Sequence, residues 1–162
     1  MGALVITAWS AISPFGLGRE LFVEGAVARR SAVADLDGAR WGSPDTRAAL
    51  VPDFDVRDVL GRKGTRGMDR FSALAVATVG RLQAEISADA TTALVLGTTT
   101  GSAETMMDIV RTGLRAKLPF HIDPASTPYG VMNGAAGQCA IWYGFRGPTR
   151  RSPRAVPPAW RR

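Results

Sequence analysis

The stretch that most constrains the fold is residues 131–143, which are small or apolar nearly throughout. Gly134 and Gly137 lie within it, and a residue without a Cβ lets neighbouring backbone approach closely. A helix that is apolar on every side has to be buried over most of its surface. The rest of the chain must therefore supply elements that surround a helix at this position.

Helices and strands are predicted to alternate in the remaining sequence. Apolar side chains recur at steps of three and four in residues 68–86, which predicts a long helix, and Asp69 lies at its start, where a carboxylate suits the helix dipole. Further helices are predicted over residues 18–28, 54–60 and 103–114, and short buried strands over residues 3–8 and 93–96. This alternation indicates an α/β layered fold.

The less regular segments are predicted to lie at the surface. Residues 34–52 mix glycine, proline, aspartate and arginine, and residues 118–129 contain three prolines. Such composition is typical of loops. The length of 162 residues is that of one domain, so we expect residues 1–149 to form a single unit.

The positive charge is concentrated at the end of the chain. The sequence has 20 basic and 14 acidic residues, a net charge of +6, but residues 149–162 contain five arginines and no acid. Without them the body is nearly neutral. A basic tail can bind nucleic acid or acidic membranes, but the body lacks interleaved aromatic and basic residues, so we expect neither partner. Residues 150–162, rich in proline and arginine, are predicted to be disordered.

The sequence predicts a soluble cytoplasmic protein without metal or cofactor. The apolar run Leu4-Val5-Ile6 is too short for a secretory signal and has no basic residues before it. No stretch approaches the roughly 20 apolar residues of a spanning helix. One cysteine excludes an internal disulfide, and one cysteine with one histidine makes a zinc site of these ligands implausible.

Three features suggest chemistry, and each has a simpler interpretation. The turn at residues 97–102, GTTTGS, lacks the lysine of a phosphate-binding loop; it is either a tight turn needing small residues or a turn lining a ligand pocket. Cys139 lies among apolar neighbours in the middle of a predicted helix, which favours a buried structural cysteine over a nucleophile. His121 and Asp123 could be a base and its orienting carboxylate, but no nucleophile is near, which favours a loop histidine.

Five blocks of sequence occur in an order and spacing that cover nearly all of residues 3–149. They are the opening ALVITAWSAISPFGLGRELFVEGAVARRSAV, then KGTRGMDRFSALA, ALVLGTTTGS, NGAAGQ and IWYGFRGPT. Together they resemble the N-terminal half of the β-ketoacyl-acyl-carrier-protein synthases, the acyltransferases that perform condensation in fatty acid and polyketide synthesis.

The resemblance implies a fold and partners. It implies a thiolase-like fold of two similar α/β halves, each with a five-stranded sheet between helices, of which this chain has the N-terminal half. It implies an acyl carrier protein as partner, and a homodimer or a heterodimer with another synthase chain. By position, Thr100, Met106 and Met107 match the acyl pocket. The basic turn with Arg62, Lys63 and Arg66 is either a solvated loop or a contact for the acidic carrier protein.

The resemblance assigns no catalytic residue to this chain. In the family a strand follows the R-G-P motif, and the nucleophilic cysteine comes next, with two histidines in the second half. Here RRSPRAVPP follows Thr149, and prolines disfavour a central strand. Cys139 precedes R-G-P, and His121 matches neither catalytic histidine.

We therefore expect a condensing enzyme that is truncated or frameshifted before the nucleophile and inactive alone. Helices without their usual covering would expose apolar faces, which predicts poor solubility or association with another chain. The alternative is a noncatalytic chain-length-factor-like or scaffold subunit that binds a synthase partner. Those relatives keep both halves of the fold and lose the cysteine by substitution.

Overall fold

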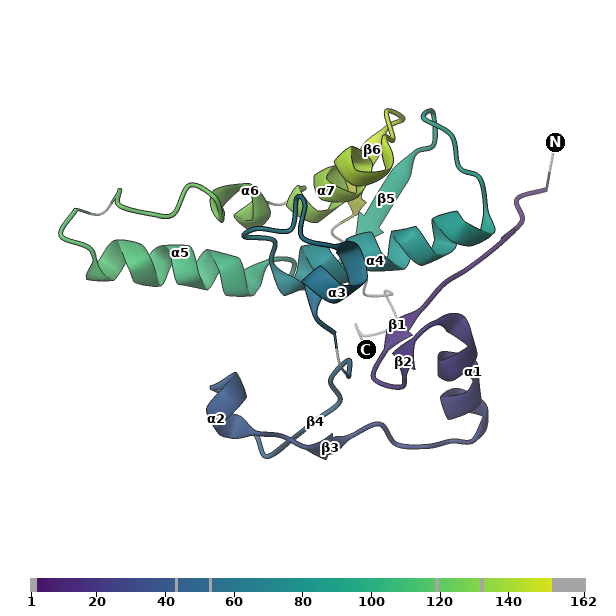
Figure 1. The fold of residues 1–162 in the computed structure, drawn as a ribbon, viewed down its shortest axis with the longest axis horizontal. Helices are drawn as coiled ribbons and strands as arrows, with labels where there is room; N and C mark the ends of the chain where they lie inside the picture. Colours follow the sequence, from purple (N-terminus) through teal and green to yellow (C-terminus); the bar gives the residue numbers. More distant parts are fainter. Residues whose placement is uncertain (1–2, 43, 53, 119, 132, 153–162) are drawn as a thin grey trace, which may run out of the picture.

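The computed structural model describes residues 3–42, 44–52, 54–118, 120–131 and 133–152. Figure 1 shows the arrangement of its helices and strands. In chain order they are β1 (Ile12–Ser13), β2 (Gly16–Leu17), α1 (Arg19–Val27), β3 (Ala34–Asp35), α2 (Gly38–Trp41), β4 (Arg47–Ala48), α3 (Val56–Leu60), α4 (Arg70–Glu85), β5 (Leu94–Gly97), α5 (Ala103–Arg115), α6 (Thr127–Gly130), α7 (Gly134–Tyr143) and β6 (Thr149–Ser152).

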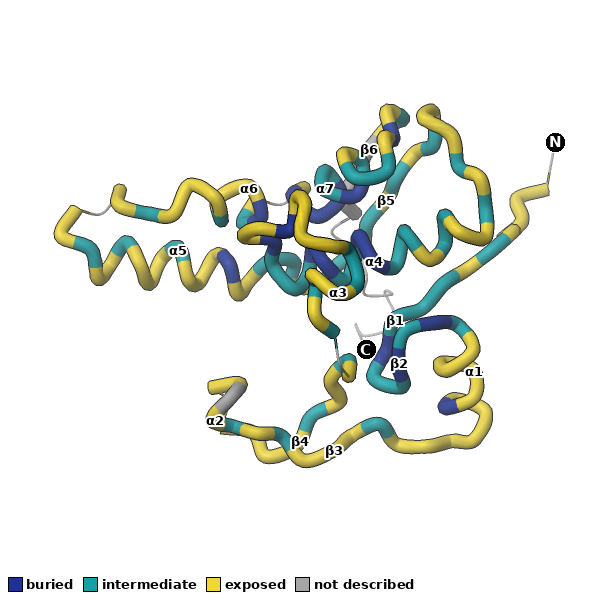
Figure 2. Tube along the Cα trace, in the orientation of Figure 1, coloured by how far each residue is buried: buried dark blue, intermediate teal, exposed yellow. Residues whose placement is uncertain are grey.

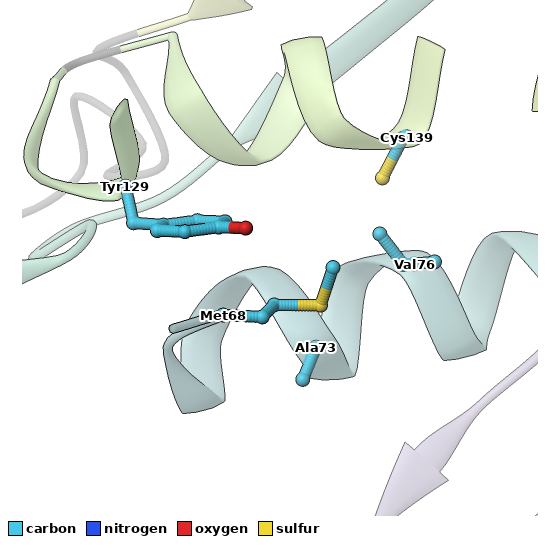
Figure 3. Close-up of a cluster of buried hydrophobic side chains, with 5 residues drawn as sticks. All are labelled: Met68, Ala73, Val76, Tyr129 and Cys139. Carbon is cyan, nitrogen blue, oxygen red and sulfur yellow. The ribbon is translucent and has the colours of Figure 1, made fainter. Parts of the chain in front are cut away.

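The core lies between α4 and α7, as Figures 2 and 3 show. The buried side chains that form it are Met68, Ala73, Val76, Tyr129 and Cys139. Small residues on both helices let them approach closely, and the hydroxyl of Tyr143 on α7 donates a hydrogen bond of 2.8 Å to the carbonyl of Val76 on α4. The predictions of a long helix and of a small-residue helix packed into the core are confirmed.

The start of α4 agrees with its sequence signal. Asp69 is the N-cap residue, and its Oδ1 accepts a hydrogen bond of 2.9 Å from the backbone N–H of Ser72. This bond satisfies a donor that a helix otherwise leaves free in its first turn. α7 begins at Gly134, three residues later than expected. A Cβ at Gly134 would lie 2.7 Å from the carbonyl oxygen of Pro128, whereas one at Gly137 would meet nothing within 4 Å, so only Gly134 serves a close approach.

Three two-stranded sheets are formed by the described residues, two antiparallel (β1–β2 and β3–β4) and one parallel (β5–β6). The resemblance implied a sheet of five strands, and the structure differs in this respect. In the parallel pair Leu94 lies opposite Thr149 and Gly97 opposite Ser152. Helix α7 contacts both strands. Residues of β5 alternate between partly buried and exposed, because only one face of the pair is covered. The prediction of a strand is thus confirmed, but it is not fully buried.

The prediction of a buried strand at residues 3–8 is wrong. These residues are in no sheet, and the side chains of Leu4, Val5 and Ile6 are 103%, 75% and 88% exposed. A strand is stabilised by hydrogen bonds and side-chain pairs with a neighbouring strand. No strand pairs with this segment in the part of the chain that the structure describes, so its apolar residues stay in solvent.

Strand β6 extends into the segment that was expected to be a disordered tail from residue 150. It pairs with β5 through residue 152. A parallel ladder uses backbone groups, which arginine and serine supply as well as any residue, and the first proline of the tail comes only at position 153. Residues 153–162 lie outside the described residues.

The N-terminal elements β1, β2 and α1 contact one another and lie beside α4. Phe15 lies against Gly25 of α1, where a Cβ would clash with the phenyl ring. The guanidinium of Arg19 forms an ion pair of 3.0 Å with Glu85 at the end of α4. Residues 34–52 follow as the expected surface excursion. Among the described helices, none is long and apolar enough to span a membrane.

Helix α5 extends from the core like an arm (Figure 1). Thr105 is its single buried residue. Along the arm, Met106, Met107, Val110 and Leu114 are all exposed. The arm therefore presents an apolar stripe to solvent, while its contact with the other elements is made mainly by α6.

Candidate functional site

A cavity of about 220 Å³ lies where the turn after β5, the start of α5 and the end of α6 meet. Its lining residues are Phe71, Thr100, Gly101, Ser102, Ala103, Met106, Gly130 and Val131. Two of the predicted pocket residues, Thr100 and Met106, line it. Met107 is not among the lining residues, and its side chain is 60% exposed.

The turn at residues 97–102 is shaped by its small residues. Gly101 has a φ of +59°, a left-handed conformation that favours glycine. Its N–H donates a hydrogen bond of 2.9 Å to the hydroxyl of Thr98. The turn therefore needs small residues, and it also lines the cavity; that the cavity takes a ligand stays a prediction.

Gly130 determines how closely the two walls of the cavity approach. A Cβ at this position would lie 3.2 Å from Cδ1 of Ile109 and 3.6 Å from Cε of Met106, both on α5. The lining combines Phe71, Met106 and Val131 with a few hydroxyl groups near the turn. Such a lining suits an apolar chain with a polar end. The sequence did not predict that Phe71, Gly130 and Val131 line this cavity. Helix periodicity and loop composition are local signals, and they do not indicate which separate elements meet in the fold.

Cys139 is not part of this cavity. Its side chain is 0% exposed in the α4–α7 core, and burial raises the pKa of the thiol to about 11. A nucleophilic cysteine needs a stabilised thiolate and access to substrate. Cys139 has neither, which confirms the prediction of a buried structural cysteine.

The pKa of Cys139 makes stability depend on pH in a defined window. Below about pH 9 the thiol is protonated in the folded and unfolded chain alike, so it contributes no pH dependence. Between its ordinary pKa of 9.0 and its folded pKa of about 11, only the unfolded chain loses the proton. The free energy of unfolding is expected to fall as pH rises through this window. Urea unfolding at several pH values, compared with Cys139→Ala, checks this: the variant should lack this part of the decline, and equal slopes would contradict it.

His121 and Asp123 do not form a catalytic pair. Both are exposed on the loop before α6. The imidazole lies edge-on to the ring of Phe120, with centroids 5.5 Å apart, and the carboxylate of Asp123 accepts a hydrogen bond of 3.0 Å from the N–H of Ala125. The histidine is a loop residue, as predicted. Within the described residues no group of three His, Cys, Asp or Glu side chains could hold a metal ion.

The basic turn before α4 is held firmly while its charges stay in solvent. Thr65 is buried, and its hydroxyl donates to the carbonyls of Gly61 and Arg62 at 2.9 and 3.1 Å. Gly64, with a φ of +81°, packs under the ring of Trp142 on α7. Arg62, Lys63 and Arg66 are exposed, and none of them forms an ion pair with the described part of the chain. The turn thus presents three exposed cations that have no ion-pair partner among the described residues.

A second hollow, of about 490 Å³, lies between α2, α3 and Arg70. The guanidinium of Arg70 lies over the rings of Trp41 and Phe54, at 5.5 and 5.4 Å from their centroids. It also donates to the carbonyl of Val51 at 3.2 Å. Arg70 therefore connects residues 34–52 to α4, and the hollow lies at the contact between the two.

The comparisons with known proteins identify the family. A model of the N-terminal domain of β-ketoacyl synthases matches residues 1–150. The chain is 27% identical over 151 residues to 3-oxoacyl-acyl-carrier-protein synthase 2 of Vibrio cholerae serotype O1. It is 29% identical over 155 residues to the protein of that name from Synechocystis sp.. Each alignment covers 90% of this chain and 36% of the relative, so the chain spans about a third of their length.

Solved structures agree with the sequence comparisons. The ishigamide ketosynthase/chain length factor superimposes with a TM-score of 0.84 at 37% identity, over 91% of this chain and 43% of that one. A β-ketoacyl synthase from Burkholderia phymatum STM815 has the same fold, with a TM-score of 0.70 at 20% identity over 90% of this chain and 38% of its own. The chain belongs to the β-ketoacyl synthase family, and it has the N-terminal half of the thiolase-like fold.

Proposed function

We propose that this chain binds the acyl group of an acyl thioester in the cavity between the turn at residues 97–102, α5 and α6. The reaction served is the decarboxylative condensation of an acyl thioester with malonyl-acyl carrier protein, in fatty acid or polyketide synthesis. The observation that carries the proposal is the cavity itself, which has a partly apolar lining and lies within the region matched to the family. Thr100 lies at the turn, and Met106 forms part of the wall on α5.

The chain is proposed to bind rather than to condense when it is alone. Condensation requires a nucleophile that can carry the acyl group. Burial holds the pKa of the Cys139 thiol at about 11, and the side chain is inaccessible. We propose that a second synthase chain takes part in the condensation. The apolar stripe on α5, formed by Met106, Met107, Val110 and Leu114, is exposed and suits such a partner.

A noncatalytic chain-length-factor-like subunit is the second candidate. The observation in its favour is the superposition with a structure described as a ketosynthase/chain length factor. A subunit of that kind would need an acyl-sized cavity and a partner surface, and no thiolate of its own. The two candidates differ in whether pairing with a second synthase chain restores activity to this one or only alters the length of the partner's products.

The proposal is tested by two measurements on the purified full chain. Calorimetric titration with acyl-pantetheine thioesters is expected to show saturable binding. Incubation with acyl- and labelled malonyl-acyl carrier protein is expected to give no β-ketoacyl product. Failure to bind any acyl thioester would sink the proposal, and product formation would contradict the role without catalysis.

The basic turn is proposed to contact the acidic carrier protein. Reversing Arg62 and Lys63 to glutamate should weaken carrier-protein binding by tenfold or more at low salt, because two attractions become repulsions. The matched control reverses Arg115 and Lys117, which are equally exposed but lie at the far end of α5. Surface plasmon resonance over a salt series provides the measurement. Equal losses for both pairs would indicate attraction by net charge alone, against a contact at the turn.

A further inference from the structure

The arm formed by α5 is joined to the core by a polar contact. Apart from Thr105, every side chain of this helix is partly or fully exposed. The hydroxyl of Thr105 donates a hydrogen bond of 3.3 Å to Oδ2 of Asp69. Helix α5, which otherwise contacts mainly α6, thus has one buried side chain, and that side chain makes a directional contact with the start of α4.

Asp69 is itself fixed, so it can act as a reference point for α5. Its Oδ1 accepts the capping hydrogen bond from Ser72, which ties the carboxylate to the first turn of α4. Helix α4 is one of the two helices that form the core, and Ser72, Ala73, Val76 and Ala77 on it are all buried. The two oxygens of one carboxylate therefore link the rigid helix to the arm.

The third helix at this junction is α6. Tyr129 on α6 is buried. Burial raises the pKa of its phenol, and the negative charge of Asp69 raises this pKa further. The next residue, Gly130, lines the cavity, just as Met106 follows Thr105 and lines the opposite wall. Thr105 also lies under this wall: a Cβ at Gly130 would be 3.8 Å from its Cγ2. The carboxylate of Asp69 thus interacts with Thr105 and with Tyr129, and the residue after each of these lines the cavity.

We propose that Asp69 and Thr105 are positioning residues that set the width of the cavity and with it the acyl chain length that it accepts. This inference rests on the proposed function of the cavity. The hydrogen bond holds the first turn of α5 at a fixed distance from α4, so Met106 is held at a fixed distance from Gly130. Without the bond, the arm has only packing against α6 to locate it, and the wall can move outward to admit a longer chain.

The test replaces Thr105 by valine, which keeps the shape of the side chain and removes the hydroxyl. Binding of acyl-pantetheine thioesters of increasing length is measured by calorimetry for the full chain. The ratio of affinities between the best-bound acyl group and one two carbons longer is expected to shift at least about fivefold towards the longer chain, the effect of one lost hydrogen bond. Thr105→Ser keeps the hydroxyl and should retain the wild-type ratio. Thr112→Val makes the same change at an exposed position of α5 and should retain it too.

The ratio separates positioning from general damage. Damage to the fold would weaken binding of every acyl length alike and leave the ratio unchanged, which would overturn the inference. If Thr105→Val does not fold, Asp69→Ser provides the same test, because the serine hydroxyl still caps α4 while no second oxygen is left to accept the hydrogen bond from Thr105. If the wild-type chain binds acyl thioesters and its length preference survives these substitutions, the inference fails alone. If the wild-type chain binds none, the proposed function fails and the inference falls with it.

Discussion

Replacing Gly147 by alanine is expected to destabilise the fold strongly, because an added methyl group would meet backbone atoms on a neighbouring segment. A Cβ at this position would lie 2.5 Å from the carbonyl oxygen of Thr92 and closer still to that of Thr91. Both obstacles are backbone atoms, so they cannot move aside by changing a rotamer. Hydrogen bonds on either side hold the two segments together, from Arg146 N to Ala90 O and from Leu94 N to Pro148 O.

The clash forces either the loop before β5 or the segment before β6 to shift, and the parallel pair depends on both. Overpacking of this kind typically costs about 1–3 kcal/mol, a large part of the stability of a small domain. Urea unfolding followed by circular dichroism measures the loss. Exchange of the β5 and β6 amides with deuterium should rise in parallel if the sheet is the part that opens.

Gly137→Ala is the matched control. This glycine lies in the middle of α7, and a Cβ there would meet no atom within 4 Å. Alanine in a helix interior is more stable than glycine by about 0.5–1 kcal/mol, so this variant should gain slightly. The two substitutions are chemically identical and lie ten positions apart. Similar losses in both would show that the backbone does not approach Gly147 as closely as described.

Replacing Met106 by tryptophan is expected to abolish acyl binding while leaving the fold intact. The indole would occupy much of a cavity of only about 220 Å³. Since the methionine is 46% exposed, the larger side chain has solvent on one side and need not strain the core. We expect the affinity for acyl-pantetheine thioesters to fall at least tenfold, with the urea midpoint unchanged.

Met107→Trp is the matched control for Met106→Trp. It places the same side chain on the same helix, one residue later and outside the cavity lining. Its affinity should remain within about twofold of the wild type, the range of ordinary surface substitutions. Equal losses at both positions would place the acyl group along the outer face of α5 rather than in the cavity. Undiminished binding by Met106→Trp would exclude the cavity outright.

The elements that sequence reasoning located correctly are those whose signals are local. The periodic apolar positions of α4, the capping carboxylate of Asp69 and the small residues of α7 each act within a few residues of chain. The α5 helix and the turn before it were likewise found from nearby residues. In each case the hydrogen bonds that define the element lie inside it, so no distant partner was required.

The errors concern features that depend on distant partners. Residues 3–8 have the composition of a strand, but a strand exists only where another lies beside it. Strand β6 shows the converse: its sequence is unpromising, yet β5 supplies a ladder. The lining of the cavity shows the same dependence. Thr100 and Met106 lie six residues apart in the sequence, whereas Gly130 joins them only through the packing of α6 on α5.

The exposed run of Leu4, Val5 and Ile6 has a consequence for handling and for the cell. Backbone donors and acceptors in an extended apolar segment are a template for any other unpaired strand, including that of a second molecule. The folded chain is then in competition with its own aggregates, and the balance is set by concentration. We expect dilution, pairing with a partner strand or capture by a holdase chaperone to keep the chain out of aggregates, and overproduction to drive it into inclusion bodies.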